Sequence, residues 1–397
     1  MLPHDPVGAT SHRDPYPYYR ALLQGSALAP GAQPGTWIAS RAAVIAQVLA
    51  HPDCRVRPLA EAVPAAIAGG SAGAIFGRLV RMNEGPAHAS AKRALGRALA
   101  GIDPARVRDA TRMHARALAA RHGLPARAML TPWMLDLPTC VVAGLLGVAQ
   151  AALAPLAAAV ADFVRCLSPL SDAAELARAD IAARSLLASV QALMTSAAIA
   201  PDGLLARVRA EAVLAGWDDD SAIAANLLGL LSQTHEATAA LAGNCIVALA
   251  TRPQLQARLR SEPQLADALV REVARFDPPV QNTRRFVARA CTIAGEALAP
   301  GDVIIVLLAA AGRDPAVHAQ PDAFLLERAP AALATFGDGR HACPGQQLAT
   351  TIAAAAIDSV LALPGALDGL CWTYRASPNC RLPLFIQTPP PASKELP

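Results

Sequence analysis

A long central part of the chain, from about residue 88 to 275, follows a helical pattern. Apolar residues recur at spacings of three and four, alanine is abundant, and breaks fall at HGLP, ALAP, IAPDG and ATRPQ. Hydrophobic residues make up 53% of the 397 residues and aromatic residues only 4%, which is typical of a compact, helix-rich protein. The sequence therefore predicts a mainly α fold.

The pattern changes after residue 278 to short β-like segments separated by turns. A further helix is predicted from 344 to about 362, and the segment CWTYRASPNCRLPLFIQ is typical of a hairpin. Neither an internal repeat nor a flexible linker divides the chain. We therefore expect a single large helical domain with small β-sheets over residues 1–397, with frayed ends at about 1–13 and 388–397.

Charge, cysteine usage and hydropathy exclude several classes of protein. The formal net charge of +4 is small for this length and comes without a dense Lys/Arg tract, so we expect no nucleic-acid partner. Eight scattered cysteines without a CxxC pair exclude a zinc knuckle and fit a reducing cytoplasm. The N-terminus lacks a signal-peptide pattern. The uncharged run 137–161 contains two prolines, and we interpret it as a buried helix broken by turns, with no membrane span.

The stretch FGDGRHACPG at 336–345 places one cysteine in a loop rich in glycine. Pro344 fits the first position of a helix, so Cys343 would lie at a helix start, where free N–H groups and the dipole favour a thiolate. A thiolate serves as a metal ligand or a nucleophile. Two other interpretations are a buried structural cysteine and a nucleophile activated by His341, for which no ordering carboxylate is present.

The same stretch resembles the haem-thiolate signature FxxGxxxCxG of the cytochrome P450 family. The match is complete and is carried by Phe336, Gly337, Gly339, His341, Cys343 and Gly345. The resemblance runs from about residue 14 to 386. It implies the P450 fold and bound haem b (iron protoporphyrin IX), with Cys343 as the iron ligand and Phe336 and Gly345 in the haem-binding loop.

A second element of the family is matched by REVARF. Here Glu272 and Arg275 resemble the ExxR pair, which together with a later arginine, Arg328, would brace the cysteine loop. An isolated pair at this spacing is more often a solvated surface feature of small energetic value. Its position before the cysteine loop gives it significance.

Four basic residues align with the family's contacts to the haem propionates. His88 and Lys92 lie at i and i+4 on one helix face and resemble the family's HxxxR pair, with lysine in place of arginine. Arg285 matches the arginine of the first strand after the ExxR helix, and His341 matches the histidine of the cysteine loop. Each residue alone would be an ordinary surface or capping residue, whereas their common register with the motif favours binding of propionate.

A long apolar helix, predicted over 223 to about 250, carries one carboxylate, Glu236, in its middle. A buried carboxylate is costly unless it is paired or functional. The family's corresponding helix crosses over the haem with the motif (A/G)Gx(D/E)T(T/S), in which the acid helps to deliver protons and the first threonine hydrogen-bonds the bound oxygen. Aligned on Glu236, the position of that threonine is occupied by Ala237.

Three replacements for the missing hydroxyl at Ala237 remain open. A hydroxyl group of the substrate and ordered water could take the role, or Gln233, Thr234 or Thr238 could serve. The third possibility is chemistry without ordinary oxygen activation, such as peroxide use, coupling, rearrangement or nitrogen transfer. Against a functional role, Gln233 and Thr234 could simply bond their own helix backbone.

The resemblance implies a soluble, monomeric, cytoplasmic monooxygenase that oxidises a small organic molecule in secondary metabolism or catabolism. Electrons would come from a ferredoxin and a ferredoxin reductase, docking on the cysteine-loop face near Arg340. Substrate contacts are expected from about 60–82, 160–200, the central helix, 279–282 and the last hairpin. A haem-binding sensor without turnover is the alternative from another class.

Overall fold

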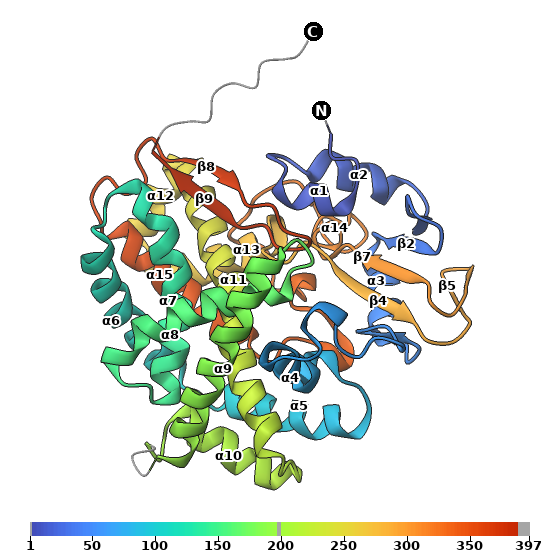
Figure 1. Cartoon of the computed structure of the whole chain (residues 1–397). Helices are drawn as coiled ribbons and strands as arrows, with labels where there is room; N and C mark the ends of the chain where they lie inside the picture. The colour runs from blue at the N-terminus through green and yellow to red at the C-terminus, as the bar shows by residue number, and fades with distance from the viewer. Residues whose placement is uncertain (1, 197–199, 388–397) are drawn as a thin grey trace.

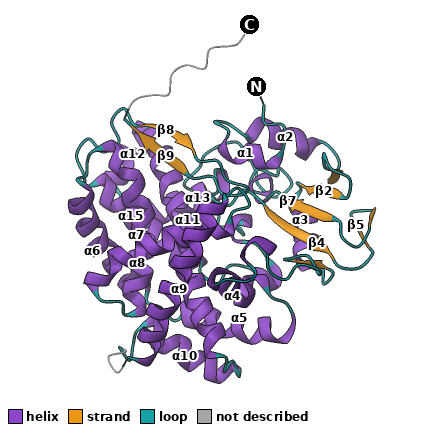
Figure 2. Cartoon of the chain, in the orientation of Figure 1, coloured by secondary structure: helices purple, strands orange, loops and turns teal. Residues whose placement is uncertain are grey.

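A computed structural model describes residues 2–196 and 200–387. Helices fill most of the molecule, and small β-sheets lie at its side and along one edge (Figure 1 and Figure 2). The predicted mainly α fold with small sheets is confirmed. The predicted frayed segment 388–397 lies outside the described residues, and the single domain over 1–397 stays a prediction.

The α-helices account for most of the described chain. Their bounds are α1 (Pro6–Ser11), α2 (Tyr16–Gln24), α3 (Ala42–Ala50), α4 (Ser71–Arg78), α5 (Gly85–Ala100), α6 (Pro104–His122), α7 (Leu130–Leu146), α8 (Gln150–Phe163), α9 (Ala173–Thr195), α10 (Leu204–Ala215), α11 (Asp220–Ala250), α12 (Pro253–Ser261), α13 (Ala266–Phe276), α14 (Leu308–Ala311) and α15 (Gln346–Leu361). Short 3₁₀ turns connect several of them: η1 (Ala65–Ile67), η2 (Val80–Met82), η3 (Arg127–Met129), η4 (Val164–Leu167), η5 (Pro263–Leu265), η6 (Ala334–Phe336) and η7 (Gly339–His341).

The strands form one five-stranded sheet and two hairpins. They are β1 (Leu28–Pro30), β2 (Thr36–Ala39), β3 (Cys54–Arg55), β4 (Thr283–Val287), β5 (Cys291–Ile293), β6 (Glu296–Leu298), β7 (Val303–Val306), β8 (Cys371–Tyr374) and β9 (Pro383–Ile386). The large sheet has the order β1-β2-β7-β4-β3, in which β2 and β7 are parallel. Strands β8 and β9 form the predicted last hairpin, with Cys371 opposite Ile386.

Helix α11 passes through the middle of the molecule (Figure 1). It begins where Asp219 accepts a hydrogen bond from the backbone N–H of Ala222 over 2.9 Å. A helix that is apolar on most sides is buried on most sides, and α11 accordingly packs against α4, α7, α9 and α15. Its 31 residues span about 46 Å. The predicted helix over 223–250 is confirmed.

Helices α7 and α8 contain the long uncharged run of the sequence. By length and composition, Arg127–Leu146 and Gln150–Leu167 are apolar enough to cross a membrane. The more apolar part of the first stretch is 67% buried inside the molecule, as expected for a core helix. The break between the two helices lies at Gly147, which has a φ of 98°. The two prolines of this run, Pro138 and Pro155, lie inside the helices, while the predicted break is present between them.

The N-terminal segment differs from the predicted frayed end. Residues 6–11 form α1, capped by Asp5, whose carboxylate accepts hydrogen bonds from the N–H groups of Val7 and Gly8. The buried side chain of Arg381 donates to the carbonyl oxygens of His12 and Arg13 over 2.6 and 3.0 Å. The segment is therefore tied to the C-terminal hairpin region, an interaction with a residue hundreds of positions away that the local sequence does not reveal.

Candidate functional site

The cysteine loop lies between η7 and α15. The backbone N–H of Cys343 donates to the carbonyl of Phe336 over 2.7 Å, which closes the loop. Gly337 and Gly339 have φ angles of 71° and 64°, in the left-handed region that favours glycine. Two of the glycines of the motif are thus required by the turn that presents the cysteine.

The start of α15 corrects one prediction. The helix begins at Gln346 with Gly345 at its N-cap, so Pro344 lies in a turn before the helix. Burial raises the pKa of the Cys343 thiol, and the backbone N–H of Gly345 and the charge of Lys92 offset this only in part. The helix start alone therefore does not favour the thiolate, and a cation at the sulfur is needed to hold the negative charge.

Cys343 nevertheless remains open on one side. The residue is exposed, while protein atoms surround the thiol closely enough to raise its pKa. The sulfur is therefore accessible from one side, although protein atoms surround most of it. Gly345 borders this sulfur, because a methyl group at its Cα would lie 3.9 Å from Cys343 Sγ.

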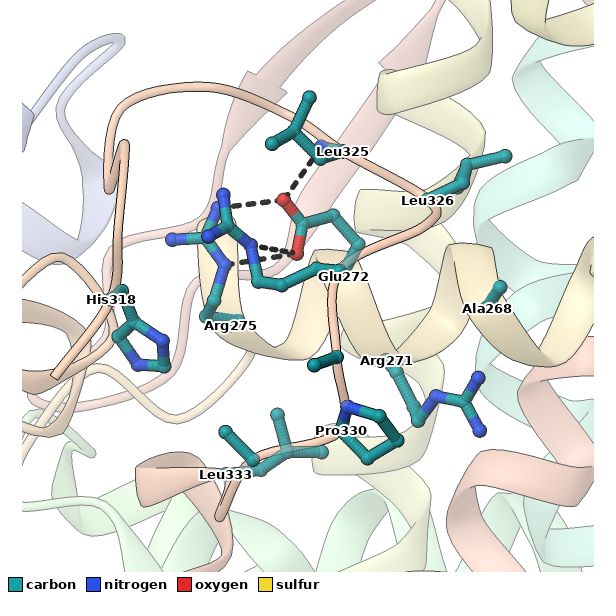
Figure 3. A pocket seen from close by; sticks show the side chains of 12 residues that line it. Ala268, Arg271, Glu272, Arg275, His318, Leu325, Leu326, Pro330 and Leu333 are labelled. Carbon is teal, nitrogen blue, oxygen red and sulfur yellow. Dashed lines mark hydrogen bonds and ion pairs between the residues drawn. The ribbon is translucent and has the colours of Figure 1, made fainter.

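A buried ion-pair cluster connects α13 to the loop that follows α14 (Figure 3). Arg275 donates from Nε and Nη2 to the two oxygens of Glu272 over 2.9 and 2.7 Å, and both side chains are almost inaccessible. Arg328 Nε lies 3.3 Å from Glu272 Oε2, as predicted. The pair is therefore not the solvated surface feature that its spacing alone favours. Gly312 is required here, because a Cβ atom would overlap the carbonyl oxygen of Arg275.

The cavity beside this cluster is small. It has a volume of about 30 Å³ and is bordered by His318, Leu326 and Leu333 among others (Figure 3). A space of this size holds about one water molecule. We therefore interpret the cluster as a structural brace and not as a substrate site.

Two of the predicted propionate residues, His88 and His341, lie next to each other with their rings tilted by 45°. The rings of His88 and His341 are 4.4 Å apart between centroids, and both residues are largely buried. Burial, with smaller contributions from the charges of His341 and Lys92, lowers the pKa of His88 to about 4. His88 Nε2 has no hydrogen-bond partner within the described chain. A buried polar nitrogen without a partner is rare, and it indicates a position where a ligand binds.

Arg285 gives the strongest sign of an anion site. Strand β4 carries it, only 5% of it is exposed, and its Nε has no partner among the described residues. Within the described chain, the side chain of Arg285 makes one hydrogen bond, from Nη1 to the carbonyl oxygen of Arg284 over 2.9 Å. Burial lowers its pKa to about 10, and the nearby charge of Arg340 contributes. An unpaired buried cation costs several kcal/mol (about 3–5 when a partner is removed), so a bound anion would stabilise this position.

Lys92 does not point its ammonium group at an open anion site in the structure. Its ammonium group donates to the carbonyl oxygen of Ala342, directly beside Cys343. Burial lowers the pKa of Lys92, and Cys343 partly counteracts this effect. The predicted i, i+4 relation to His88 holds, since both lie on α5.

Glu84 is a member of the site that the sequence reasoning missed. It precedes α5, and its carboxylate lies 3.0 Å from Arg340 Nε and 3.3 Å from His341 Nε2. Burial opposes its ionisation, but the hydrogen bonds to His341 and Arg340 prevail and lower its pKa to about 2. The sequence did contain a signal for Glu84: it is an acidic residue directly before a helix that carries two candidate ligands.

Arg340 also differs from its expected role at a docking surface. Besides Glu84, its guanidinium group donates to the carbonyl oxygens of Ala50, His51 and Cys54 over 3.3, 3.1 and 3.1 Å. These bonds connect η7 to α3 and β3. The side chain is thus engaged within the protein and orients the histidine next to it in sequence.

These residues fit a haem. The site offers a sulfur donor that needs a cation, and beside it the buried basic side chains of Arg285 and His88 lack acidic partners. Haem supplies both complements, namely an iron centre and two propionates. Cys343, His341, His88 and Arg285 are the residues that would hold it.

One stripe of the otherwise buried α11 is accessible. Leu230, Gln233, Thr234 and Ala237 are intermediate or exposed, whereas most neighbouring residues of the helix are buried. Their spacing of three and four places them on one face, so this face borders an open space inside the molecule. Thr238 is buried and lies off this face. Gln233 Nε2 donates to the carbonyl of Gly229 over 2.8 Å, which is the backbone bond of the non-functional interpretation.

Glu236 is paired and not isolated. Its Oε1 lies 2.7 Å from Arg375 Nη2, and the two side chains are 31% and 22% exposed. The expected buried carboxylate is therefore a partly accessible ion pair between α11 and the loop that follows β8. His235 points elsewhere, since its buried ring bonds Thr139 of α7 over 3.1 Å.

A larger cavity of about 510 Å³ lies between η1, α4 and α9. Small and apolar residues line most of it, including Ile67, Ala72 and Leu176, with the carboxylate of Asp180 at the border. Asp180 Oδ1 accepts a hydrogen bond from the N–H of Ala72 over 2.9 Å. Two of the segments from which substrate contacts were predicted, 60–82 and 160–200, meet at this cavity.

Comparisons with known sequences support the resemblance to the cytochrome P450 family. A family model described as Cytochrome P450 matches residues 215–362. Cytochrome P450 144 of Mycobacterium tuberculosis is 34% identical over 215 residues, which are 54% of this chain and 49% of the relative. The biotin biosynthesis cytochrome P450 of Bacillus subtilis is 34% identical over 143 residues, 36% of each chain. The chain thus spans about half or less of the length of these curated relatives.

Solved structures resemble the chain over almost its whole length. The crystal structure of CalO2 shares 27% identity and a TM-score of 0.81, covering 97% of this chain and 98% of that one. The structure of P450BioI with acyl carrier protein ligated to hexadec-9Z-enoic acid shares 22% identity and a TM-score of 0.79, covering 95% and 98%. The second likeness shows the fold alone.

Proposed function

Because this chain belongs to the cytochrome P450 family, we propose that it is a haem-thiolate monooxygenase that oxidises a small organic molecule. One observation carries the proposal: Cys343 is accessible, and the buried basic side chains of His88 and Arg285 have polar atoms without hydrogen-bond partners among the described residues. Haem b is the form of the cofactor that two propionates and a non-covalent pocket imply. When bound, it supplies the oxygen chemistry, while the chain binds, orients and protects the reactants.

We assign the holding of the cofactor to Cys343 and the basic side chains of the site. Cys343 would hold the iron as a thiolate. Arg285, His341 and His88 would bind the propionates, and Lys92 would turn from the Ala342 carbonyl to join them. Phe336 and Gly345 shape the loop around the sulfur, since one closes the turn and the other leaves the sulfur uncovered.

We assign the handling of protons and substrate to α11. Glu236 can hold and release a proton at Oε1, because its pair with Arg375 is accessible and therefore breakable. Gln233 and Thr234 face the open space and would hold water or polar groups of the substrate. Thr238 is buried, which favours the other two residues for this role.

A second candidate function is atypical chemistry on the same cofactor. Ala237 lies on the accessible stripe of α11 and has no hydroxyl to donate a hydrogen bond or a proton. Peroxide use, coupling, rearrangement or nitrogen transfer does not need that hydroxyl. Incorporation of labelled dioxygen into the product supports the monooxygenase, and its absence with continued turnover supports the atypical reaction.

The remaining assignments concern partners and context. We propose a ferredoxin and a ferredoxin reductase as electron donors, and a soluble, monomeric, cytoplasmic protein of secondary metabolism or catabolism. Turnover with a surrogate ferredoxin and a substrate panel distinguishes this enzyme from a haem-binding sensor, which would give none. A carrier-bound substrate is a further variant to include in the panel, since one structural neighbour holds an acyl carrier protein.

The central test is the reduced, carbon monoxide-bound absorption spectrum of the purified protein. We expect a thiolate-type Soret band that is lost in Cys343→Ala and kept in Cys371→Ala, a matched control on strand β8. A band that persists in Cys343→Ala, or a protein that binds no haem, would contradict the proposal.

A further inference from the structure

Arg81 is a largely enclosed cation that the roles proposed above do not use. It lies in the turn η2 between α4 and α5, and its Nε is buried with no hydrogen-bond partner among the described residues. Burial lowers the pKa of its guanidinium group, and among the described residues the thiol of Cys166 is the only ionisable group that counteracts this effect. Burial raises the pKa of Cys166 to about 12, so this thiol is neutral and the charge of Arg81 stays uncompensated.

The backbone that carries Arg81 is held rigidly. Asn226 of α11 accepts from the N–H of Val80 over 2.7 Å and donates to the carbonyl of Arg78 over 2.9 Å. Asn83 donates to the carbonyl of Leu79 over 2.8 Å. A guanidinium group placed by such a fixed turn is preorganised, which reduces the entropy lost when it binds a ligand.

The position of η2 is next to the open face of α11. The side chain of Leu79 packs on Gly229, where a Cβ atom would lie 2.8 Å from Leu79 Cδ2. Gly229 lies one turn before Gln233. From Gln233 the accessible stripe of α11 runs on to Ala237. Arg81 therefore lies on the α11 side from which a substrate is approached.

Cys166 of η4 relates the same arginine to the cavity of about 510 Å³. The charges that bear on the Cys166 thiol are those of Arg81 and Asp180, and Asp180 lines that cavity. Cys166 is thus a common neighbour of Arg81 and of a residue that lines the cavity, while the turn that carries Arg81 is bonded to α11.

Arg81 is separate from the group that would bind propionates. The charges that affect the pKa of His88 are those of His341, Lys92, Glu84 and Arg340, and Arg81 is not among them. The charges that affect Arg285 likewise exclude it. A propionate held by His88 and Arg285 would leave Arg81 without a partner.

We propose that Arg81 binds the carboxylate of the substrate, so that this protein acts on organic acids with an apolar body. The planar guanidinium group pairs with a carboxylate through two parallel hydrogen bonds, and the alanine-rich cavity accepts the apolar part. The inference rests on the proposed function, because substrate binding is read out at the haem.

The test compares acids with their neutral amides. Decanoate is titrated against decanamide, and 4-phenylbutyrate against 4-phenylbutyramide, into the haem-loaded protein while the Soret shift is followed. We expect each acid to bind about 10- to 100-fold more tightly than its amide, the range of one charge-assisted pair. In Arg81→Gln this preference should fall to about 1, and Arg81→Lys should restore part of it.

A matched control separates the effect of Arg81 from general damage. Arg78→Gln removes an exposed arginine three residues earlier, whose side chain bonds only the carbonyl of Ala74. It should keep the preference for acids. The inference is overturned if neither acid shifts the Soret band or binds better than its amide, or if Arg81→Gln keeps the preference.

Two measurements distinguish failure of this inference from failure of the proposed function. A missing thiolate-type carbon monoxide spectrum in the unaltered protein refutes the proposed function itself. A normal spectrum with a loss of haem content in Arg81→Gln, at unchanged acid preference, would make Arg81 a haem contact and refute the inference alone. Without ligand, Arg81→Met should raise the melting temperature, because it removes an unpaired enclosed charge, whereas a structural arginine would give a decrease.

Discussion

At the residue scale, the site is defined by charges that lack partners. Most arginines of the described chain with little exposure are paired, as Arg275 is with Glu272 and Arg381 with Asp277. Arg285 and Arg81 depart from this pattern. Because an enclosed charge without a partner is costly, such positions persist where a ligand completes them. The two arginines belong to different parts of the site, which is why we assign them different ligands.

The first prediction concerns Arg285. Replacement by Met should weaken haem binding about 10- to 100-fold, the loss of one charge-assisted hydrogen bond to a propionate. Titration of the haem-free protein with haemin measures this change. In the haem-free protein the same replacement should raise the free energy of unfolding, since it removes a buried unpaired cation.

The control for Arg285 is Arg289→Gln. Arg289 lies two residues after β4, and its largely exposed side chain pairs with Asp53 at the surface. Such pairs contribute about 0–1 kcal/mol, so haem affinity should not change. Equal haem binding by Arg285→Met and the unaltered protein would contradict the propionate role.

The second prediction is a pH dependence that originates at Glu84. Its folded-state pKa is about 2, below the usual value of 4.5, so its ionised form stabilises the folded state. The stability it contributes is fully present above the usual pKa and is lost as the pH falls from about 4.5 toward 2. Urea unfolding of the haem-loaded protein should show Glu84→Gln less stable than the unaltered protein at pH 6, with the difference shrinking toward pH 3.

Glu296→Gln serves as the control for Glu84, because Glu296 is an exposed residue of β6. Its stability difference should be small and nearly constant over the same pH range. A difference for Glu84→Gln that grows on acidification would have the wrong sign for a carboxylate with a lowered pKa and would refute the argument.

At the element scale, α11 connects the reaction face to the C-terminal hairpin. The ion pair between Glu236 and Arg375 joins the helix to the loop after β8. Both partners are partly exposed, so solvent screens the pair and its contribution to stability should stay below about 1 kcal/mol. The pair therefore serves mainly to fix the position of the Glu236 carboxylate and not to stabilise the fold.

The third prediction follows from this pair. Glu236→Gln should lower the turnover number by at least about tenfold, as expected for loss of a proton-transferring group, while the free energy of unfolding changes by less than about 1 kcal/mol. Arg375→Gln should keep much of the turnover but alter its pH profile. The measurements are oxygen-coupled turnover against pH and urea unfolding; full turnover in Glu236→Gln would remove the carboxylate from the proton path.

Elements were more predictable than their contacts. The periodicity of the sequence was enough for α11 and for the last hairpin, because each depends on a local repeat of apolar residues. The start of α15 was placed too early, since Pro344 suits a helix start as well as the turn in which it lies. Glu84 was missed and Arg340 was misplaced, because their partners come from loops far away in the sequence.

At the scale of the whole molecule, Arg381 holds the two ends of the described chain together. Its Nε lies 2.7 Å from Asp277 Oδ1 at the end of α13, and its Nη atoms donate to the carbonyl oxygens of Thr10, His12 and Arg13. Only 2% of the side chain is exposed. Burial lowers the pKa of Arg381, but Asp277 together with the nearby tyrosines Tyr374, Tyr16 and Tyr19 outweighs this effect and raises the pKa overall, so the guanidinium group stays charged.

The fourth prediction is that Arg381→Gln loosens this connection. The change leaves the carboxylate of Asp277 without its cation, and breaking a buried pair from one side costs about 3–5 kcal/mol. Limited proteolysis should then cut first within residues 2–15, because α1 is too short to persist without its tertiary contacts. Arg20→Gln, which removes an exposed pair with Asp322, should leave both stability and the cleavage pattern unchanged. If Arg381→Gln unfolds at the same urea concentration as the unaltered protein, the N-terminal helix is held by its apolar contacts and not by this arginine.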